Sequence, residues 1–375
     1  MKVKKLLFRN FRNYERLEIE PTNGINLFLG PNAQGKTNII EAVYYSALGR
    51  SHRTKSDNEL IRWNEQQALV RLDFERADVG NSLEFKFHSN KRREIIYNGV
   101  PIAMKELIGA INVVMFSPED LFIVKGAPAG RRRFLDMEIS QADPAYFSDL
   151  MMLTHIITQR NALLKKIRDE EITDRSMLEL WSKPLAKAAA SVVKKRLKSV
   201  AKLNVIANDL QKSIAGETED LNISYEVMSG KKHEFDEQLS VDDMAEWYMT
   251  LFNEITENDI ARGYTSLGPH RDDLKIEVKG VDLRTFGSQG QQRTGALALK
   301  LAELSFFKDE TGEYPVLLLD DVMSELDKSR RSSLLDFLKA ENIQTFITAT
   351  DDAYFPNNGM QDRFQIYNVK SGHII

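Results

Sequence analysis

The chain has 375 residues, of which 42% are apolar, 28% are charged and none is cysteine, and its formal net charge is −4. These proportions are typical of a globular protein with about two or three domains, and they exclude a disordered or collagen-like chain. The lack of cysteine excludes disulfides, a thiolate nucleophile and a thiolate-bound zinc or iron–sulfur cluster, and it fits a reducing, cytoplasmic compartment.

The apolar stretches of the chain are short. Residues 111–116 and 316–319 are far below the ~18 consecutive apolar residues that a membrane-spanning helix needs. The basic start of the chain is followed by an apolar run, residues 6–8, that is too short for the core of a signal peptide. We therefore expect a soluble, unprocessed protein in the cytoplasm with no membrane partner.

Residues 1–125 predict mainly strands, with turn residues such as Asn98-Gly99 between them. One helix, over residues 38–48, interrupts the strands, and Gly49 is a natural stop after its last turn. The expected strands are 4–8, 25–29, 68–74, 83–87, 95–97 and 112–116.

Glycine is nearly absent from residues 126–254, and this region predicts helices over 151–168, 178–214 and 241–256. Pro184 is expected to break or begin one of them, because proline lacks the backbone N–H that a helix interior uses.

Strands and helices alternate again from residue 255 to the end of the chain. The pattern predicts helices over 293–308 and 330–340 and strands over 316–319 and 345–348. Alternation of this kind implies a parallel sheet with helices packed on it.

A phosphate-binding motif stands between the second expected strand and the helix after it. Residues 30–37 read Gly-Pro-Asn-Ala-Gln-Gly-Lys-Thr and match G-x-x-x-x-G-K-[ST]. Gly30 and Gly35 let the backbone wrap a phosphate, Lys36 would reach the β- and γ-phosphates, and Thr37 would bind Mg²⁺. The alternative is an ordinary glycine-rich turn. The predicted nucleotide contacts are Gly30, Pro31, Asn32, Ala33, Gln34, Gly35, Lys36, Thr37 and Asn38.

Two adjacent carboxylates, Asp320 and Asp321, follow the apolar strand 316–319. Burying charge there is costly without a cation, so a functional pair is favoured over a solvated strand end. Asp320 would join Thr37 as a ligand of Mg²⁺, and Asp321 would orient or deprotonate an attacking water. The sequence thus predicts a site for a nucleoside triphosphate and Mg²⁺ whose reacting groups are Lys36, Asp320 and Asp321.

Lys36 and Asp320 lie near opposite ends of the chain, much farther apart than a compact P-loop kinase or GTPase needs. A second glycine-containing turn, residues 286–293, opens a helix, where Ser288 and the N–H of Gly290 could face an anion. The alternative is a loop-to-helix turn without a ligand. We predict an α/β head formed by residues 1–125 and 255–375, with residues 126–254 inserted as a helical unit.

The combination of these motifs resembles an ABC-type ATPase of the SMC-like group. That group joins a phosphate loop, a Ser-x-Gly-Gln signature, an acidic strand end and a Ser-x-Leu-Asp segment, which here is residues 324–327. Further blocks narrow the resemblance to the bacterial RecF family, and it covers nearly the whole chain. They are residues 11–14, 51–53, 117–121, 130–136, 266–273, 287–293 and 318–327.

The resemblance implies a P-loop ATPase head (lobe I) with an inserted α-helical lid domain (lobe II). It also implies a cytoplasmic DNA-repair ATPase that dimerises when ATP is bound and engages DNA near single-strand gaps. With RecO and RecR, such proteins help load RecA, supporting replication-fork recovery and SOS induction. In a head-to-tail pair, Ser288 and Gly290 of one protomer would close on the γ-phosphate held by Lys36 of the other.

Three departures from the wider cassette pattern indicate slow hydrolysis. Asp321 stands where cassettes usually have glutamate, Thr350 follows a strand where many have histidine, and residues 116–120 contain no glutamine. We therefore expect a timed switch and not a motor.

Two groups of basic residues are candidates for contacting DNA. One is a lysine stripe on the helix 185–203, whose alternative is a solvated face; Arg196 lies within the apolar arc and fits neither interpretation. The other follows the phosphate-loop helix. The candidates are Lys187, Lys194 and Lys198 in the stripe, and Arg50, Arg53, Lys55 and Arg62 in the second group.

Other residues have two possible roles. Residues 130–133 would contact phosphates or pair within the helical unit, and residues 270–273 favour a structural or communication loop over a metal site. Arg12 and Asn13 are nucleotide contacts by resemblance only, and the three tryptophans are expected in the core or at an interface. The rival functions are a non-hydrolysing ATP-bound DNA clamp and a P-loop kinase for a small metabolite.

Overall fold

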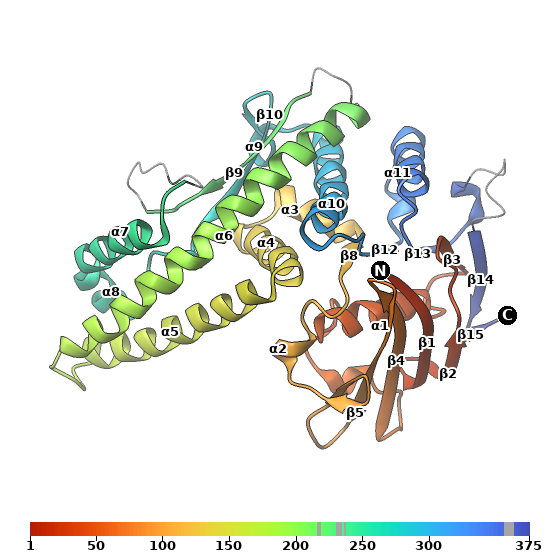
Figure 1. Ribbon diagram of the computed structural model, residues 1–375, viewed down its shortest axis with the longest axis horizontal. Helices are drawn as coiled ribbons and strands as arrows, with labels where there is room; N and C mark the ends of the chain where they lie inside the picture. The colour runs from red at the N-terminus through yellow and green to blue at the C-terminus, as the bar shows by residue number, and fades with distance from the viewer. Residues whose placement is uncertain (216–218, 230–234, 236–237, 356–363) are drawn as a thin grey trace. The chain divides into compact units, whose positions relative to one another are not determined.

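The computed structural model describes the chain apart from residues 216–218, 230–234, 236–237 and 356–363. It divides into two compact units, Met1–Asp120 with Lys300–Ile375, and Leu121–Leu299 (Figure 1). We call them unit 1 and unit 2. Unit 1 is therefore assembled from both ends of the chain.

The first sheet of unit 1 is antiparallel and has the strand order β2-β1-β4-β5-β6-β7. Alternate residues of β4 are buried, which is the pattern of a sheet with one face on a core. The strands are β1 (Lys2–Phe11), β2 (Tyr14–Ile19), β4 (Gln67–Arg76), β5 (Val79–His88), β6 (Glu94–Tyr97) and β7 (Val100–Pro101).

The second sheet of unit 1 has the order β15-β14-β3-β13-β12-β8, and its strands from β14 to β8 all run parallel, as the alternation of strands and helices predicted. β13 is buried at every position, as in a parallel sheet covered on both faces. The strands are β3 (Ile25–Leu29), β8 (Val113–Phe116), β12 (Val316–Asp320), β13 (Thr345–Ala349), β14 (Phe364–Lys370) and β15 (His373–Ile374).

The helix α1 (Lys36–Leu48) contacts β12 and β13 of the parallel sheet and β4 and β5 of the antiparallel sheet. It lies between the two sheets (Figure 1), and for this reason nearly all of its residues are buried, including Glu41. The remaining elements of unit 1 are α2 (Met104–Leu107), α11 (Lys328–Ala340) and the short 3₁₀ turns η1 (Asp57–Leu60), η2 (Pro118–Asp120), η3 (Val322–Ser324) and η4 (Asp352–Tyr354).

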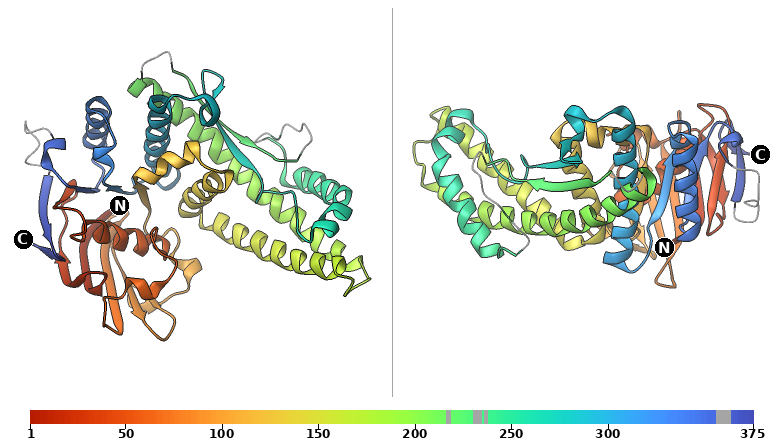
Figure 2. Two further views of the ribbon diagram at one scale, coloured as in Figure 1. Left: turned by 180° about the vertical axis from the view of Figure 1, so that it is seen from behind. Right: turned by 90° about the horizontal axis from the view of Figure 1, so that it is seen from above.

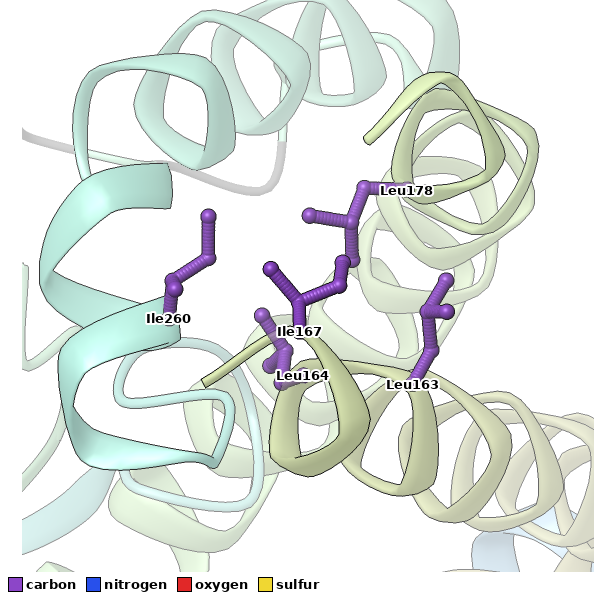
Figure 3. Packing of buried hydrophobic residues seen from close by; sticks show 5 residues of the cluster. All are labelled: Leu163, Leu164, Ile167, Leu178 and Ile260. Atoms are coloured by element: carbon purple, nitrogen blue, oxygen red, sulfur yellow. The ribbon is translucent and has the colours of Figure 1, made fainter. Parts of the chain in front are cut away.

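Unit 2 is mainly helical, with a small antiparallel sheet of order β11-β10-β9. A buried cluster joins α5, α6 and α8 through Leu164, Leu178 and Ile260 (Figure 3). The elements are α3 (Leu121–Lys125), α4 (Pro128–Ala142), α5 (Pro144–Arg168), α6 (Ser176–Ala215), β9 (Leu221–Glu226), α7 (Val241–Glu254), α8 (Thr256–Arg262), β10 (Asp273–Val278), β11 (Val281–Asp282) and α9 (Leu283–Phe286).

The division falls inside α10 (Gln289–Thr311), at residues 299 and 300, whereas the sequence placed it at 254 and 255. The reason is long-range pairing: β10 pairs with β9, and α8 packs on α5, so residues 255–282 lie in unit 2. The border near residue 125 differs by only a few residues.

The prediction that Pro184 breaks or begins a helix is wrong. Pro184 lies inside α6, which pairs with α5 in a helical hairpin (Figure 2). The flanking Ser182, Leu185 and Ala186 are buried, so their packing keeps α6 continuous although Pro184 has no N–H to donate to the preceding turn. Within the described residues, none of the helices combines the length and hydropathy that crossing a membrane requires.

Candidate functional site

The phosphate loop, residues 30–37, connects β3 to α1 in a shape that requires glycine. The φ angles of Gly30 and Gly35 are 155° and 115°. A Cβ at Gly30 would lie 2.3 Å from the carbonyl oxygen of Val369, and one at Gly35 would lie 2.7 Å from the side chain of Asn13. Val369 and Asn13 therefore pack tightly against the outer side of the loop. The loop leads into the N-terminus of α1, where backbone N–H groups and the helix dipole favour an anion.

Lys36 turns its ammonium back toward the loop. Its Nζ donates to the carbonyl oxygens of Gly30 at 2.6 Å and Pro31 at 2.8 Å. Burial lowers the pKa of Lys36, although the carboxylates of Asp321 and Asp320 oppose this effect. Among the described residues, the hydrogen-bond acceptors of this ammonium are thus neutral carbonyl groups, which an anionic oxygen could replace.

The two distant motifs meet at one edge of the parallel sheet. The Thr37 hydroxyl donates to Oδ1 of Asp320 at 2.9 Å, and the Thr348 hydroxyl donates to the same oxygen at 2.7 Å. β13 lies between β3 and β12, which explains why Thr348 reaches the site. Sequence reasoning missed Thr348; its signal was a threonine near the end of the expected strand 345–348.

The hydroxyl and carboxylate oxygens of Thr37 and Asp320 are ligands of the type that Mg²⁺ prefers. Across the described part of the chain, no group of three or more His, Cys, Asp and Glu residues could hold a metal by itself. A magnesium ion held by few protein ligands together with phosphates fits this arrangement.

Asp321 has a left-handed backbone, with φ at 55°. Its N–H donates to the Thr348 hydroxyl at 3.0 Å. Burial and the neighbouring carboxylate of Asp320 raise the pKa of Asp321, and Lys36 opposes them. Asp321 is therefore more basic than an ordinary aspartate, as a group that accepts a proton from water should be.

Two turns brace the phosphate loop. The side-chain amide of Asn13 donates to the carbonyl of Gln34 at 2.9 Å and accepts from Asn38 at 2.8 Å. The backbone N–H groups of Ser371 and Gly372 donate to the side chain and carbonyl of Gln34. Asn13 thus contacts the loop itself.

The predicted signature turn lies in unit 2, at the start of α10. Ser288 and Gln291 bond reciprocally: the Ser288 hydroxyl accepts from the Gln291 N–H at 3.2 Å, and the Gln291 side chain accepts from the Ser288 N–H at 3.1 Å. This is the pattern of a capping box. Gly290 follows within the first turn of the helix. The hydrogen bonds between Ser288 and Gln291 therefore fix the first turn of α10. The N–H groups of this turn are those that the sequence predicted to face an anion.

Some of the basic residues predicted to contact DNA are exposed, and others already bind groups of the protein itself. In unit 1, Arg50 and Lys55 are exposed, Arg62 pairs with Glu15 at 3.2 Å, and Arg53 donates to Asn38 at 2.8 Å. In unit 2, Lys194 donates to the carbonyl of Leu239 at 2.8 Å, whereas Lys187 and Lys198 are exposed.

The other arginine-rich motif is engaged inside unit 2. Arg131 makes a two-pronged pair with Asp273 at 2.7 Å, and Arg132 donates to the carbonyl of Asp272 at 2.6 Å. Arg196, the residue that fitted neither interpretation of its helix, is buried and binds Asp136 at 2.7 Å. Arg131, Arg132 and Arg196 are thus engaged inside unit 2, which for Arg131 and Arg132 is a structural role, although their partners Asp273 and Asp272 lie outside the helical unit predicted over residues 126–254.

Trp63, which was expected in the core or at an interface, lies outside the core, since 91% of it is exposed. Trp181 packs partly buried against the cluster of α5, α6 and α8. Trp247 contacts the ring of Tyr248.

A family model described as "RecF/RecN/SMC N terminal domain" matches residues 2–374. The chain belongs to this family. It is 42% identical to the DNA replication and repair protein RecF of Halothermothrix orenii, over 100% of the chain and 98% of that relative. It is 40% identical to RecF of Bacillus subtilis over 93% of each. The resemblance to RecF that the motifs predicted is confirmed.

Solved structures agree with this fold class. One described as "Structure of the recombination mediator protein RecF-ATPrS in RecFOR pathway" superposes with a TM-score of 0.89 at 36% identity, covering 99% of this chain and 97% of the other. The Smc head domain of Pyrococcus furiosus, at 16% identity and a TM-score of 0.57, shares the fold. The predicted α/β SMC-type ATPase head is confirmed, and this membership argues against the small-metabolite kinase.

Proposed function

We propose that this protein is an ATP-dependent DNA-binding ATPase of recombinational repair. The contact between Thr37 and Asp320 at 2.9 Å supports the ATPase part most directly, because it brings the phosphate-loop helix and the acidic strand end into one site. The relatives are named DNA replication and repair proteins, and one solved relative is described as RecF-ATP in the RecFOR pathway. These names support the same function here.

The triphosphate would lie in the loop, with the N–H groups at the start of α1 and the ammonium of Lys36 on its oxygens. Lys36 would exchange the carbonyls of Gly30 and Pro31 for phosphate oxygens. Thr37 and Asp320 would hold Mg²⁺, which neutralises phosphate charge when bound. Asp321 would orient the attacking water and take its proton at a carboxylate oxygen.

Nucleotide would also control assembly. We propose a head-to-tail homodimer in which Ser288 and Gly290 of one copy close on the γ-phosphate in the loop of the other. Only the triphosphate spans both elements, so hydrolysis would release the copies. The aspartate at position 321, shorter than the usual glutamate, supports slow hydrolysis. Stimulation of this hydrolysis by DNA is part of the same proposal.

The biological role follows as part of the same proposal. The ATP-bound dimer would bind duplex DNA near gaps or single-strand junctions through Arg50, Arg53, Lys55 and Arg62 or through the lysines of α6. With RecR and RecO it would promote RecA loading in the cytoplasm, supporting replication-fork recovery and SOS induction.

Sedimentation with ADP, ATP and a non-hydrolysable analogue, each with and without gapped DNA, tests the proposal. We expect monomers with ADP and dimers with ATP or the analogue, with the dimer strengthened by DNA. A protein that stays monomeric when saturated with the analogue on gapped DNA would contradict it. ATP-bound dimers on DNA without phosphate release would instead indicate a non-hydrolysing clamp.

A further inference from the structure

Glu41 is a buried carboxylate in α1, just beyond the phosphate loop, with none of its surface exposed. A carboxylate out of water is costly unless cations and hydrogen-bond donors surround it. Arg12 supplies two hydrogen bonds, at 2.8 and 2.6 Å, and the Ser51 hydroxyl donates a third. The guanidinium of Arg53 lies 3.6 Å away. Glu41 therefore binds two arginines and a serine at once.

These partners come from two separate segments. Arg12 lies in the turn between β1 and β2, with φ at 54°, a backbone conformation that costs energy for an arginine. Its guanidinium also donates to the carbonyl of Glu59 at 2.8 Å. Ser51 and Arg53 follow the end of α1, and the Ser51 hydroxyl accepts from the Arg53 N–H at 2.9 Å. Glu41 thus ties both segments to α1.

The same segments contact the phosphate loop. Asn13, next to Arg12, binds the carbonyl of Gln34 and the side chain of Asn38. Arg53 donates to the other side of the Asn38 amide at 2.8 Å. A closed ring of contacts therefore runs from Glu41 through Arg12, Asn13, Asn38 and Arg53 back to Glu41.

Burial raises the pKa of Glu41, but Arg12, Ser51 and Arg53 outweigh it and leave the pKa below its usual value. Glu41 is therefore the anion that balances two guanidinium groups beside the loop.

We propose that Glu41 is a positioning residue of the nucleotide site: its carboxylate fixes Arg12 and Arg53, and through Asn13 and Asn38 it holds the phosphate loop in the shape that accepts a triphosphate. This inference rests on the proposed function that the loop binds ATP. It assigns Glu41 no contact with the nucleotide.

The direction in which a substitution of Glu41 changes ATP affinity distinguishes a positioning role from a simple effect of charge. Glu41→Gln keeps the size of the side chain and removes one negative charge near a site for an anion. Charge alone would make ATP bind more tightly. Loss of positioning makes ATP bind more weakly, by about tenfold, the size of effect that outer partners have on metal sites.

The test is calorimetric titration with ATP and Mg²⁺ alongside thermal unfolding. The variants are Glu41→Gln, Glu41→Asp and the double variant Glu41→Gln with Arg12→Gln. We expect weaker ATP binding in Glu41→Gln and partial recovery in Glu41→Asp, which keeps the charge. The double variant should regain stability, because it also removes the arginine left without its anion, but not ATP affinity. Glu59→Gln is the matched control, since Arg12 uses only the carbonyl of this exposed residue.

Each outcome decides the matter. ATP binding in folded Glu41→Gln that equals or exceeds the wild type would overturn positioning, and so would a double variant that regains affinity together with stability. If Glu41→Gln does not fold, Arg53→Gln, which leaves the pair of Glu41 and Arg12 intact, must weaken ATP binding, and unchanged affinity would overturn the inference. A wild-type protein that binds no ATP would instead refute the proposed function.

Discussion

The phosphate loop of unit 1 and the buried arginine cluster of unit 2 both gather cationic side chains, but the cations have different partners. In the loop, Lys36 is bound by neutral carbonyl groups. In the cluster, which consists of Arg131 and Arg196 with Asp136 and Asp273, both arginines bind carboxylates. A cation on neutral acceptors can exchange them for a phosphate, whereas one in a buried ion pair cannot do so cheaply. The partner, and not the basic residue, distinguishes a ligand site from a structural one.

The largest effect should come from breaking the cluster. Arg196→Met removes a buried guanidinium and leaves the partly buried Asp136 without its cation, so we expect unfolding free energy to fall by about 3 kcal/mol. Denaturant unfolding measures this loss. Arg133→Met, at an exposed position of the same motif, is the control and should change stability by at most about 0.5 kcal/mol. Equal losses in both variants would remove the distinction between the two regions.

Lys36→Met should show the reverse behaviour. It removes the cation that would bind phosphate oxygens, so ATP affinity should fall by about 100-fold, close to 2.7 kcal/mol. Thermal stability should change little, because its present partners are neutral carbonyls. Calorimetric titration beside a melting curve separates the two quantities, with exposed Lys105→Met as control. A variant that melts early yet binds ATP normally would show that Lys36 is structural.

Asp321→Asn tests whether the acidic strand end is chemically active. Without a group to accept a proton from water, phosphate release should slow by about 100-fold or more. ATP should still bind, because Lys36, Thr37 and Asp320 remain, and the ATP dimer should persist longer. Single-turnover phosphate release with sedimentation measures both. An unchanged rate would assign proton acceptance to another group.

The smallest net effect on the wild type concerns pH and lies within unit 2. Burial raises the pKa of Asp272 to about 6 from its usual 3.8, and burial lowers the pKa of His270 to about 4 from 6.5. As pH rises from about 4 to 6, the folded state holds more protons than the unfolded state at Asp272, so its contribution to stability falls. At His270 the folded state holds fewer, so its contribution rises.

The two contributions, each at most about 3 kcal/mol, nearly cancel in the wild type. Asp272→Asn should therefore make stability rise with pH across this window, and His270→Asn should make it fall. Denaturant unfolding at several pH values checks the opposite slopes. Slopes of the same sign would mean that one of the two groups titrates normally.

The parts of the site that are formed by neighbouring residues could be predicted from local sequence motifs. The phosphate loop, its helix and the acidic strand end were all predictable because glycines, an apolar run and a terminal charge lie together in the chain. The parallel sheet followed from the alternation of strands and helices. The roles assigned to Lys36, Asp320, Asp321, Ser288 and Gly290 stay predictions.

Features that depend on distant partners were not predictable. The strand β9 lies in a region expected to be helical and exists because it pairs with β10. Arg196 looked anomalous because its carboxylate, Asp136, lies on another helix. Glu41 carries no local signature and Thr348 only its place at the end of an expected strand, since their contacts with Arg12 and Asp320 arise only when separate segments pack together.

The central claim is that one copy's phosphate loop and another copy's signature turn share a nucleotide, and mixing two variants tests it most directly. Lys36→Ala disables the loop and Ser288→Arg disables the turn, so neither variant should dimerise alone with a non-hydrolysable ATP analogue. In an equimolar mixture, a head-to-tail pair contains one intact composite site. Sedimentation should therefore show dimers only in the mixture. A mixture that stays monomeric, or dimers formed by either variant alone, would contradict the account.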